Sequence, residues 1–342
     1  MASSVDLPGG APPAERYPPS RLAVVAIGRN EGERLVRCLD SVRAVAEQVV
    51  YVDSGSTDGS VAHARSVGAQ VVELDMSLPF TAARARNAGL EAARARTPEL
   101  QWVQFLDGDC EMDPGWLPAA FARVEEDPSL AVVCGRRRER HPDRTVFNRL
   151  CDLEWDTPVG EALASGGDAL MRVEALLEVD GFRPELIAGE EPELCYRLRR
   201  AGWRIERIDA EMTLHDADIT RLEQWWKRSE RAGHAFAEWA VLHGVADDER
   251  MGVKEAVSSV AWASMATAGA VVPPLGVAVS AAAAASAFRN YRRLREGGLE
   301  RADAALYAGH CVAAKLPQAV GVTRLLMNRL RRKDSRLIEY KA

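Results

Sequence analysis

The sequence predicts an α/β protein with a mixed, mainly parallel central sheet, followed by a helical C-terminal region. Short apolar runs alternate with helical segments through the first third of the chain, which is typical of βαβ units with helices on both faces of a sheet. The apolar runs end in polar residues, and ligands bind beyond the carboxyl ends of such strands. A long segment without charge, 256–288, comes much later.

The expected elements follow from this alternation. Four strands are expected over 21–28, 47–53, 69–75 and 100–109. Helices are expected over 31–42, up to Ala64 and over 81–96. Beyond Arg136 the pattern is less regular. A helix followed by a strand is expected within 189–208, and the residues 219–244 predict one long amphipathic helix.

Length and composition indicate a folded protein. The 342 residues suffice for one large domain or two ordinary ones, and 47% hydrophobic with 27% charged residues is a globular balance. Residues 1–20 are rich in Pro, Gly and Ser and lack the apolar core of a signal peptide, so we expect a flexible leader. An α/β domain over 21–245 and a helical region over 246–342 are expected to follow.

The charge is distributed unevenly. The formal net charge is −6, but Arg289–Ala342 carry 13 Lys/Arg against 5 Asp/Glu, which leaves −14 for the remainder. A basic end on an acidic body indicates an anionic partner surface, membrane or nucleic acid. A solvated basic tail explains the same count equally well.

Two classes of site are disfavoured by absent motifs. The six cysteines, at positions 38, 110, 134, 151, 195 and 311, include no CxxC pair, which favours reduced thiols over a disulfide framework or a zinc site. The sequence also contains neither GxGxxG nor GxxxxGK[ST]. The phosphate-binding loops of dinucleotide-binding and P-loop proteins are therefore not expected.

The uncharged segment 256–288 is interrupted by Pro273-Pro274. As one helix it would run about 50 Å, longer than a hydrocarbon core of about 30 Å, so two arms of 17 and 14 residues are expected as a hairpin or kinked helix. Its many alanines also fit a buried hairpin. The following RNYRRLR is typical of the cytoplasmic flank of membrane segments. We expect membrane contact, in plane or re-entrant rather than as a simple span.

Two aspartates end the fourth strand. Asp107 and Asp109 are separated by Gly108, and residues two apart in a strand point to the same side. Such a pair can hold Mg²⁺ or Mn²⁺ and leave positions for phosphate oxygens. An ordinary Asp-Gly turn is the alternative.

Other polar residues follow neighbouring strands. Asp53 precedes a Ser/Gly/Thr loop and could accept hydrogen bonds from a base or a ribose hydroxyl, whereas Asp58 fits a helix cap. Arg84 and Asn87 lie three apart at a helix start. Arg84 could reach a diphosphate or the carboxylates around the metal, or remain a solvated surface arginine.

Later residues offer a base and further contacts. Glu190 and Glu191 stand at a helix N-terminus, where they either stabilise the dipole or supply a general base. His215 fits a third metal ligand or an ordinary loop histidine. One helix combines aromatic and cationic residues that could cover a diphosphate or merely pack, namely Gln224, Trp225, Trp226, Lys227, Arg228 and Arg231.

In order and spacing these segments resemble the inverting, GT-A-type glycosyltransferases of family 2, over roughly residues 21–240. The resemblance covers the opening strand and helix, the nucleotide-binding loop, the Arg-Asn-Gly helix, the Asp-x-Asp motif, the acceptor-side loop and the Glu-Asp motif. The matching segments are VVAIGRNEGERLVRCLDSV, VDSGSTDGS, ARARNAGLEAA, FLDGDC, SGGDALMRVEALLEVDGF and GEEPELCYRLRRAGW, with QWWKRSERAGH as a looser match. It implies a Rossmann-like GT-A fold for nucleotide-diphospho-sugars.

The resemblance also implies a donor site. Asn30, Glu31, Asp53 and the Ser/Gly loop at Gly55 would contact the nucleotide-sugar, with Asp107 beside them. Uracil, guanine and thymine nucleotides all remain open.

Catalytic roles are implied in the same way. Asp109 would ligate Mg²⁺ or Mn²⁺, which neutralises the departing diphosphate. Glu191 falls where the family has an aspartate base, and Glu190 is its substitute because the longer side chain weakens that assignment.

The implied function is metal-dependent transfer of a sugar, with inversion, to a glycan or lipid-linked hydroxyl acceptor. The hydrophobic segment resembles membrane-associated members that build cell-surface polysaccharides or glycolipids, at the cytoplasmic face of a bacterial inner membrane. Membrane lipids are expected partners and nucleic acid is not. The alternatives are a non-catalytic nucleotide-sugar-binding scaffold and a sugar-phosphate nucleotidyltransferase, which would carry a Gly-rich basic loop where this chain has IGRNEGE.

Overall fold

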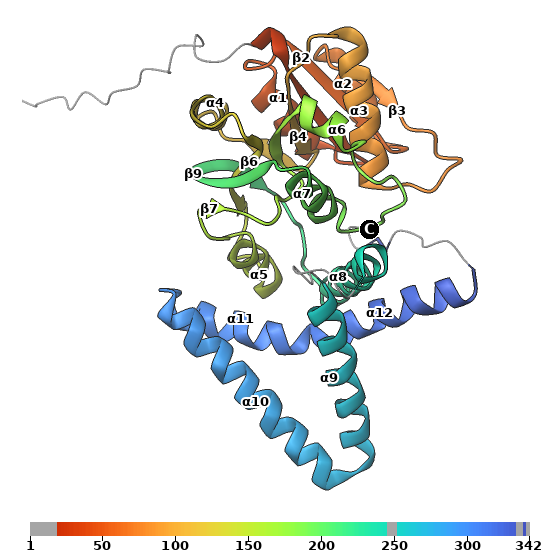
Figure 1. The fold of residues 1–342 in the computed structure, drawn as a ribbon, viewed down its shortest axis with the longest axis vertical. Coiled ribbons are helices and arrows are strands. Elements are labelled where there is room, and N and C mark those ends of the chain that lie inside the picture. The colour runs from red at the N-terminus through yellow and green to blue at the C-terminus, as the bar shows by residue number, and fades with distance from the viewer. Residues whose placement is uncertain (1–18, 245–251, 333–337, 340–342) are drawn as a thin grey trace, which may run out of the picture.

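The computed structural model describes residues 19–244, 252–332 and 338–339. Residues 1–18 of the expected leader lie outside this range. Within it a nine-stranded sheet has the order β3-β2-β1-β4-β8-β6-β9-β5, with β7 pairing to β9 (Figure 1). The strands are β1 (Leu22–Gly28), β2 (Gln48–Asp53), β3 (Gln70–Glu73), β4 (Trp102–Asp107), β5 (Cys110–Met112), β6 (Leu130–Glu139), β7 (Gly160–Glu161), β8 (Ala169–Arg172) and β9 (Arg204–His215).

Helices connect and cover these strands. They are α1 (Glu33–Val42), α2 (Ser60–Ser66), α3 (Ala82–Arg96), α4 (Trp116–Glu126), α5 (Val146–Glu154), α6 (Val173–Glu178), α7 (Glu190–Arg200), α8 (Leu222–His243), α9 (Val253–Val271), α10 (Pro273–Glu296), α11 (Arg301–Ala313) and α12 (Lys315–Leu330). The four strands and three helices expected before residue 110 are confirmed, with small shifts at their ends. The later helix–strand pair and the long amphipathic helix are also present, as α7, β9 and α8.

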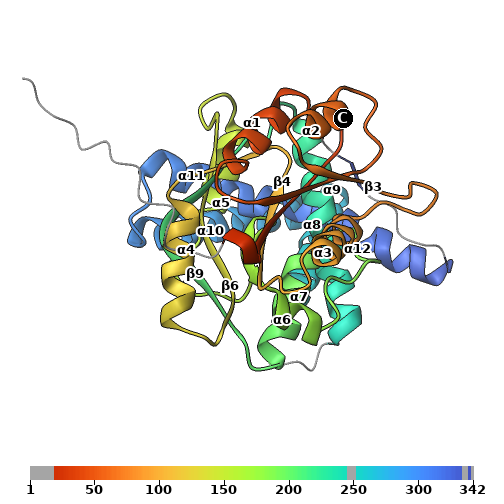
Figure 2. The same cartoon turned by 90° about the horizontal axis from the view of Figure 1, so that it is seen from above.

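The first half of the sheet is parallel. Strand β1 lies between β2 and β4, and its register sets Gly28 opposite Asp53 and Ile27 opposite Asp107. Figure 2 shows α1 and α3 on opposite sides of these strands. Because helices cover both faces, the strands are continuously apolar rather than alternating. The carboxyl ends of β1, β2 and β4 therefore meet at one edge.

The second half makes the sheet mixed. Strand β8 runs antiparallel to β4 and to β6, whereas β6 and β9 are parallel. The short β5 returns antiparallel to the end of β9, which sets Cys110 directly opposite His215. A segment 105 positions later in the chain is thus brought beside the end of β4.

The C-terminal helices extend away from the sheet. In Figure 1, α9 and α10 form two sides of a triangle that α11 and α12 close. The expected break at the prolines is confirmed, since Val272 separates the helices and Pro273 begins α10. The arms are longer than expected, 19 and 24 residues, because each helix continues into the charged residues that flank the apolar segment.

Close packing fastens these helices to the α/β part. A Cβ on Gly321 of α12 would lie 1.9 Å from the Glu230 carbonyl oxygen of α8, so only glycine permits this crossing. Arg149 of α5 donates from Nε to Oδ1 of Asp303 in α11 at 2.8 Å. The base of the helical triangle is therefore tied to the same helices that border the site described below.

The hairpin itself is exposed. Helix α10 contains no buried residue, and Val271 and Val277 keep 78% and 72% of their surface accessible. None of the described helices combines the length and hydropathy that a bilayer crossing requires.

Candidate active site

The site begins where β4 ends. Asp107 is the last residue of β4, and the amide of Gly108 donates to the Ile27 carbonyl oxygen of β1 at 2.8 Å. The chain turns there, next to the loop that follows β1. This is the edge of a parallel sheet at which ligands bind.

Two arginines hold the Asp107 carboxylate. Oδ1 accepts from Nη2 of Arg86 at 3.0 Å, and Oδ2 accepts from Nη2 of Arg137 at 3.3 Å. Arg86 is 2% exposed, and a guanidinium so deeply buried must be paired with carboxylates. The neighbouring acids raise the pKa of both arginines further above its ordinary value, against the opposing effect of burial.

Asp168 holds Asp107 and Arg137 in place through direct contacts with both. It is fully buried and accepts from the Asp107 amide at 2.9 Å, from Oγ1 of Thr213 at 2.7 Å and from Arg137 at 2.8 Å. The preceding Gly167 has no room for a side chain, because a Cβ would lie 2.7 Å from Oδ2 of Asp107 and from Nη2 of Arg86. The backbone of the SGGD segment therefore passes close to the Asp107 carboxylate.

Glu190 and Glu191 share the other side of Arg86. Nη1 of Arg86 lies 2.9 Å from Oε1 of Glu190 and 3.1 Å from Oε1 of Glu191. Both acids occupy the first turn of α7, which begins after Gly189 at a left-handed φ of 78°. Burial and the charge of Glu190 raise the pKa of Glu191 to about 7, and Arg86 opposes them. A carboxyl with that pKa is suited to general-base work near neutral pH.

Asp109 lies beside His215 and does not share a potential cation site with Asp107. Oδ2 of Asp109 lies 3.1 Å from Nε2 of His215, and both residues are buried. Burial lowers the pKa of His215 to about 4, so its imidazole is neutral at pH 7, which is the form that binds metals. A carboxylate beside a neutral imidazole fits a divalent cation. Among the described residues, no group of potential ligand atoms contains both Asp107 and Asp109.

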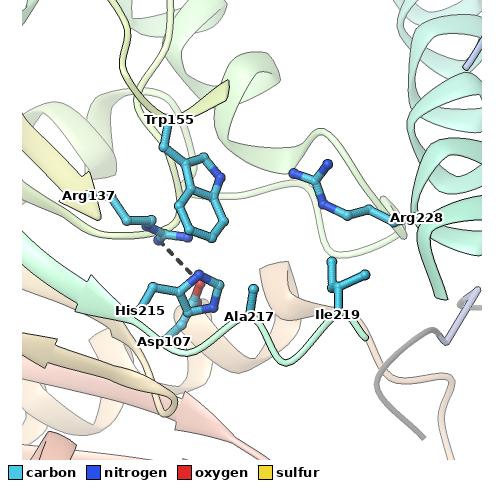
Figure 3. Close-up of a pocket in the computed structure, with 7 residues that line it drawn as sticks. All are labelled: Asp107, Arg137, Trp155, His215, Ala217, Ile219 and Arg228. Atoms are coloured by element: carbon cyan, nitrogen blue, oxygen red, sulfur yellow. Dashed lines mark hydrogen bonds and ion pairs between the residues drawn. The ribbon is translucent and has the colours of Figure 1, made fainter. Parts of the chain in front are cut away.

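A cavity of about 120 Å³ opens beside these groups. Figure 3 shows the Arg137–Asp107 pair and His215 on one side and Arg228 on the other. The Trp155 ring lies 4.6 Å from the His215 ring, centroid to centroid. The lining residues are Asp107, Arg137, Trp155, His215, Ala217, Ile219 and Arg228. Its charged lining consists of two arginines, Arg137 and Arg228, and one carboxylate, Asp107.

Asp53 and Asn30 shape the loop after β2. Oδ2 of Asp53 accepts from the amides of Gly55 at 2.9 Å and Ser56 at 2.8 Å. Oδ1 of Asn30 accepts from the Thr57 amide at 2.7 Å. These hydrogen bonds hold the backbone of the loop, and contact of its residues with a nucleotide stays a prediction.

Glu31 and Asp58 border the same loop. Glu31 forms an ion pair with Arg34 at 2.9 Å. Oδ1 of Asp58 accepts at 2.9 Å from the amide of Ser60, the first residue of α2. The N-cap of α2 is Gly59, one residue after Asp58, so the expected cap at Asp58 is wrong by one residue, although its carboxylate still accepts from the first amide of the helix.

Arg86, not Arg84, reaches the carboxylates. The guanidinium of Arg84 instead donates to the backbone carbonyls of the preceding loop, at Asp75, Leu78 and Pro79. Arg86 shares the buried face of α3 with Ala83, Leu90 and Ala93. Asn87 makes two hydrogen bonds to the Phe182 backbone, at 2.7 and 3.0 Å. Arg84 therefore does not reach the carboxylates, and its contact with a diphosphate stays a prediction.

Of the aromatic and cationic set on α8, Arg228 is the member that lines the cavity. It donates to both carboxylate oxygens of Glu154, at 2.7 and 3.1 Å. Gln224 accepts from the Arg221 amide at 3.0 Å and caps α8, while the buried Trp225 packs between α5 and α11. The packing interpretation therefore holds for Gln224 and Trp225.

Besides Arg86, three residues of the site were not anticipated from the sequence: Asp168, Arg137 and Trp155. A signal existed for Asp168, since an acid that follows Gly-Gly and precedes an apolar run marks a close backbone approach. Arg137 and Trp155 gave none, because RRRER and LEWD look like solvated surface.

Comparisons with known proteins agree with this geometry. The family described as glycosyl transferase family 2 matches residues 24–167. A pre-mycofactocin glycosyltransferase of Mycobacterium tuberculosis is 29% identical over 235 residues, which cover 65% of this chain and 48% of that protein. The chain thus spans about half the length of this curated relative. A TPR repeat-containing protein of Synechococcus elongatus is 33% identical over 139 residues, 41% of this chain and 32% of that protein.

A solved structure shows the fold. The mannosyltransferase PcManGT from Pyrobaculum calidifontis, in complex with GDP-Man and Mn²⁺, superposes with a TM-score of 0.59 at 20% identity, over 89% of this chain and 87% of that one. The expected GT-A α/β fold with a C-terminal helical region is therefore confirmed.

Proposed function

We propose, because residues 24–167 match the family described as glycosyl transferase family 2, that the chain transfers a sugar from a nucleotide-diphosphate sugar to a hydroxyl acceptor with inversion. We assign this reaction to residues 21–245. One observation carries the proposal: a carboxyl with a pKa of about 7, Glu191, is linked through Arg86 to Asp107 at the cavity, beside the buried Asp109–His215 pair.

Each residue has a role in this reaction. Glu191 accepts the proton of the attacking hydroxyl, and Arg86 keeps that carboxyl and Asp107 at a fixed separation. Asp109 and His215 would hold the cation, which supplies charge neutralisation for the diphosphate as it leaves. Arg228 faces the cavity from the opposite wall and is placed to bind an anionic oxygen. Single displacement at the anomeric carbon then inverts its configuration.

The donor class can be tested on the full chain. With Mn²⁺ present, GDP-mannose heads the panel because a structural relative binds it, followed by other GDP-, UDP- and dTDP-sugars. A true donor at 100 times its dissociation constant should raise the free energy of unfolding by about 2.7 kcal/mol, measurable as a thermal shift. With a glycan or lipid-linked acceptor it should release nucleoside diphosphate.

The outcomes separate the alternatives. Stabilisation without release for any acceptor would indicate a nucleotide-sugar-binding scaffold. Formation of a nucleotide-sugar from a sugar phosphate and a nucleoside triphosphate would indicate a nucleotidyltransferase. A product that keeps the donor's anomeric configuration would contradict the single displacement.

We further propose that the α9–α10 hairpin lies against the cytoplasmic face of the cell membrane and that the acceptor is built into cell-surface polysaccharide or glycolipid. The exposed valines of the hairpin and the arginines that follow them, Arg289, Arg292 and Arg293, support this. Apolar side chains at the hairpin and cations at its base match the chemistry of an anionic lipid surface.

Vesicle binding should depend on the hairpin. Replacing Val271 and Val277 with aspartate should lower partitioning onto anionic phospholipid vesicles at least about tenfold, since burial of each valine contributes about 1.5–3 kcal/mol. The control is Val159→Asp, which changes a valine of similar exposure, 55%, on the α/β part. Co-sedimentation measures the effect. Equal vesicle binding by the hairpin variant and the Val159→Asp control would contradict the proposal. A dimer that depends on the hairpin and forms without lipid would contradict it as well.

A further inference from the structure

Cys110 lies next to the proposed cation site but has no role in the transfer reaction. It follows Asp109 directly, begins β5 and is 1% exposed. In the antiparallel pair of β5 and β9 it stands opposite His215. Directly opposed residues leave the same face of a sheet, so the thiol and the imidazole are neighbours by register.

Three different ligand atoms meet at this point. Sγ of Cys110 lies 3.8 Å from Oδ1 of Asp109, and Oδ2 of Asp109 lies 3.1 Å from Nε2 of His215. The ligand atoms of all three residues lie within 4.8 Å of one another, and all three residues are buried. In a tetrahedral zinc complex, ligand atoms at their usual bond lengths stand about 3.3–3.5 Å apart. Shifts of up to about 1.3 Å would bring all three ligand atoms to that spacing.

The thiol also lies in a second group, with Asp107 and Asp168. Arg137 already bonds to both of those carboxylates, at 3.3 and 2.8 Å. A cation there would have to displace a buried guanidinium. The group with Asp109 and His215 does not contain the carboxylates that Arg137 bonds, and it combines oxygen, sulfur and nitrogen ligands, so it is the better site.

We propose that Asp109, Cys110 and His215 together form a mixed oxygen, sulfur and nitrogen site for thiophilic dications such as Zn²⁺ and Co²⁺, with the Cys110 sulfur as a direct ligand. Mg²⁺ and Mn²⁺ prefer oxygen ligands, whereas sulfur ligands select softer ions. The thiol releases its proton to solvent when the ion binds. This inference rests on the proposed function, because Asp109 and His215 are the residues assigned there to the catalytic cation.

Cobalt absorption reports the sulfur ligand directly. Co²⁺ titrated into the metal-stripped full chain should produce a thiolate-to-cobalt charge-transfer band in the near ultraviolet. Cys110→Ser and Cys110→Ala should both lack the band. Cys38→Ser is the matched control, because Cys38 is equally buried and its Sγ lies 3.7 Å from the Asp107 carbonyl oxygen, outside the ligand group. It should keep the band.

Competition against Co²⁺ or a metal indicator gives the affinities. Cys110→Ser should weaken Zn²⁺ binding at least about 100-fold, since even outer-sphere changes cost 10–100-fold. Mn²⁺ affinity should change less than about threefold. A wild-type chain without the band would overturn the proposal, and so would a band that persists in Cys110→Ser.

The same titration separates this inference from the proposed function. Suppose that Mn²⁺ binds the original chain, that Asp109→Asn abolishes this binding, and that Co²⁺ gives no thiolate band. The catalytic cation site then stands, and the role of Cys110 fails. If Asp109→Asn leaves Mn²⁺ binding unchanged, the cation assignment of the proposed function fails with it.

Discussion

Asp109→Asn should lower kcat/KM for sugar transfer by about 1,000-fold or more. The substitution keeps the shape of the side chain but removes the charge that would bind the cation opposite His215. Loss of that cation withdraws several kcal/mol of charge stabilisation from the leaving diphosphate, and about 4 kcal/mol corresponds to this factor. Donor binding in the presence of Mn²⁺ should weaken as well, and calorimetry on the same protein measures it.

The control for this change is Asp143→Asn. Asp143 is an exposed acid on the loop before α5, so its amide variant should retain full activity. If Asp109→Asn also retained full activity, the assignment of Asp109 to the cation would be wrong.

Glu191→Gln should lower kcat by about 10²–10⁴-fold while leaving donor affinity within about threefold of the original. Removal of a general base costs that factor, and an amide cannot accept the proton of the acceptor hydroxyl. Glu190→Gln is the paired variant, because both acids contact Arg86. If Glu190→Gln alone removed turnover, the base would be Glu190.

The pH dependence supplies a second readout of the same residue. The pKa of Glu191 is raised to about 7, so kcat/KM should fall below about pH 7 as the carboxyl becomes protonated. Glu191→Gln should flatten this acid limb in whatever activity remains. The sign for stability is opposite: a raised carboxyl pKa stabilises the fold at low pH, and this contribution is lost as pH rises from about 4.5 to about 7.

The parallel half of the sheet could be predicted closely, and the reason is physical. Strands covered on both faces are mostly apolar, as in Leu22–Gly28 and Trp102–Asp107, and this pattern is readily recognised in the sequence. The polar residues at their carboxyl ends were visible for the same reason. The break of the C-terminal hairpin at Pro273 followed from the chemistry of proline.

The spatial separation of Asp107 from Asp109 could not be predicted from strand alternation. Alternation along a strand predicts that both carboxylates point to one side, but β4 ends at Asp107 and the chain turns at Gly108. The rule therefore stops applying between the two residues. Asp109 then meets His215, whose position depends on the pairing of β5 with β9 more than a hundred residues later.

The choice between Arg84 and Arg86 as the buried arginine depends on a single helix, α3. The motif ARARNAG offers two arginines, and only the phase of α3 decides between them. Once Thr81 is known as the N-cap, the buried stripe of Ala83, Arg86 and Leu90 follows from helical periodicity. The helix over 81–96 was predicted correctly, so its periodicity already distinguished the buried Arg86 from Arg84.

The site described above holds more carboxylates than guanidinium groups. Asp107, Asp168, Glu190 and Glu191 form ion pairs with Arg86 and Arg137, and Asp109 lies beside a neutral His215. This excess repels a diphosphate and attracts a dication. Donor and cation are therefore linked ligands: each must raise the affinity for the other by the same factor, so their binding is cooperative even if no atom of the protein moves.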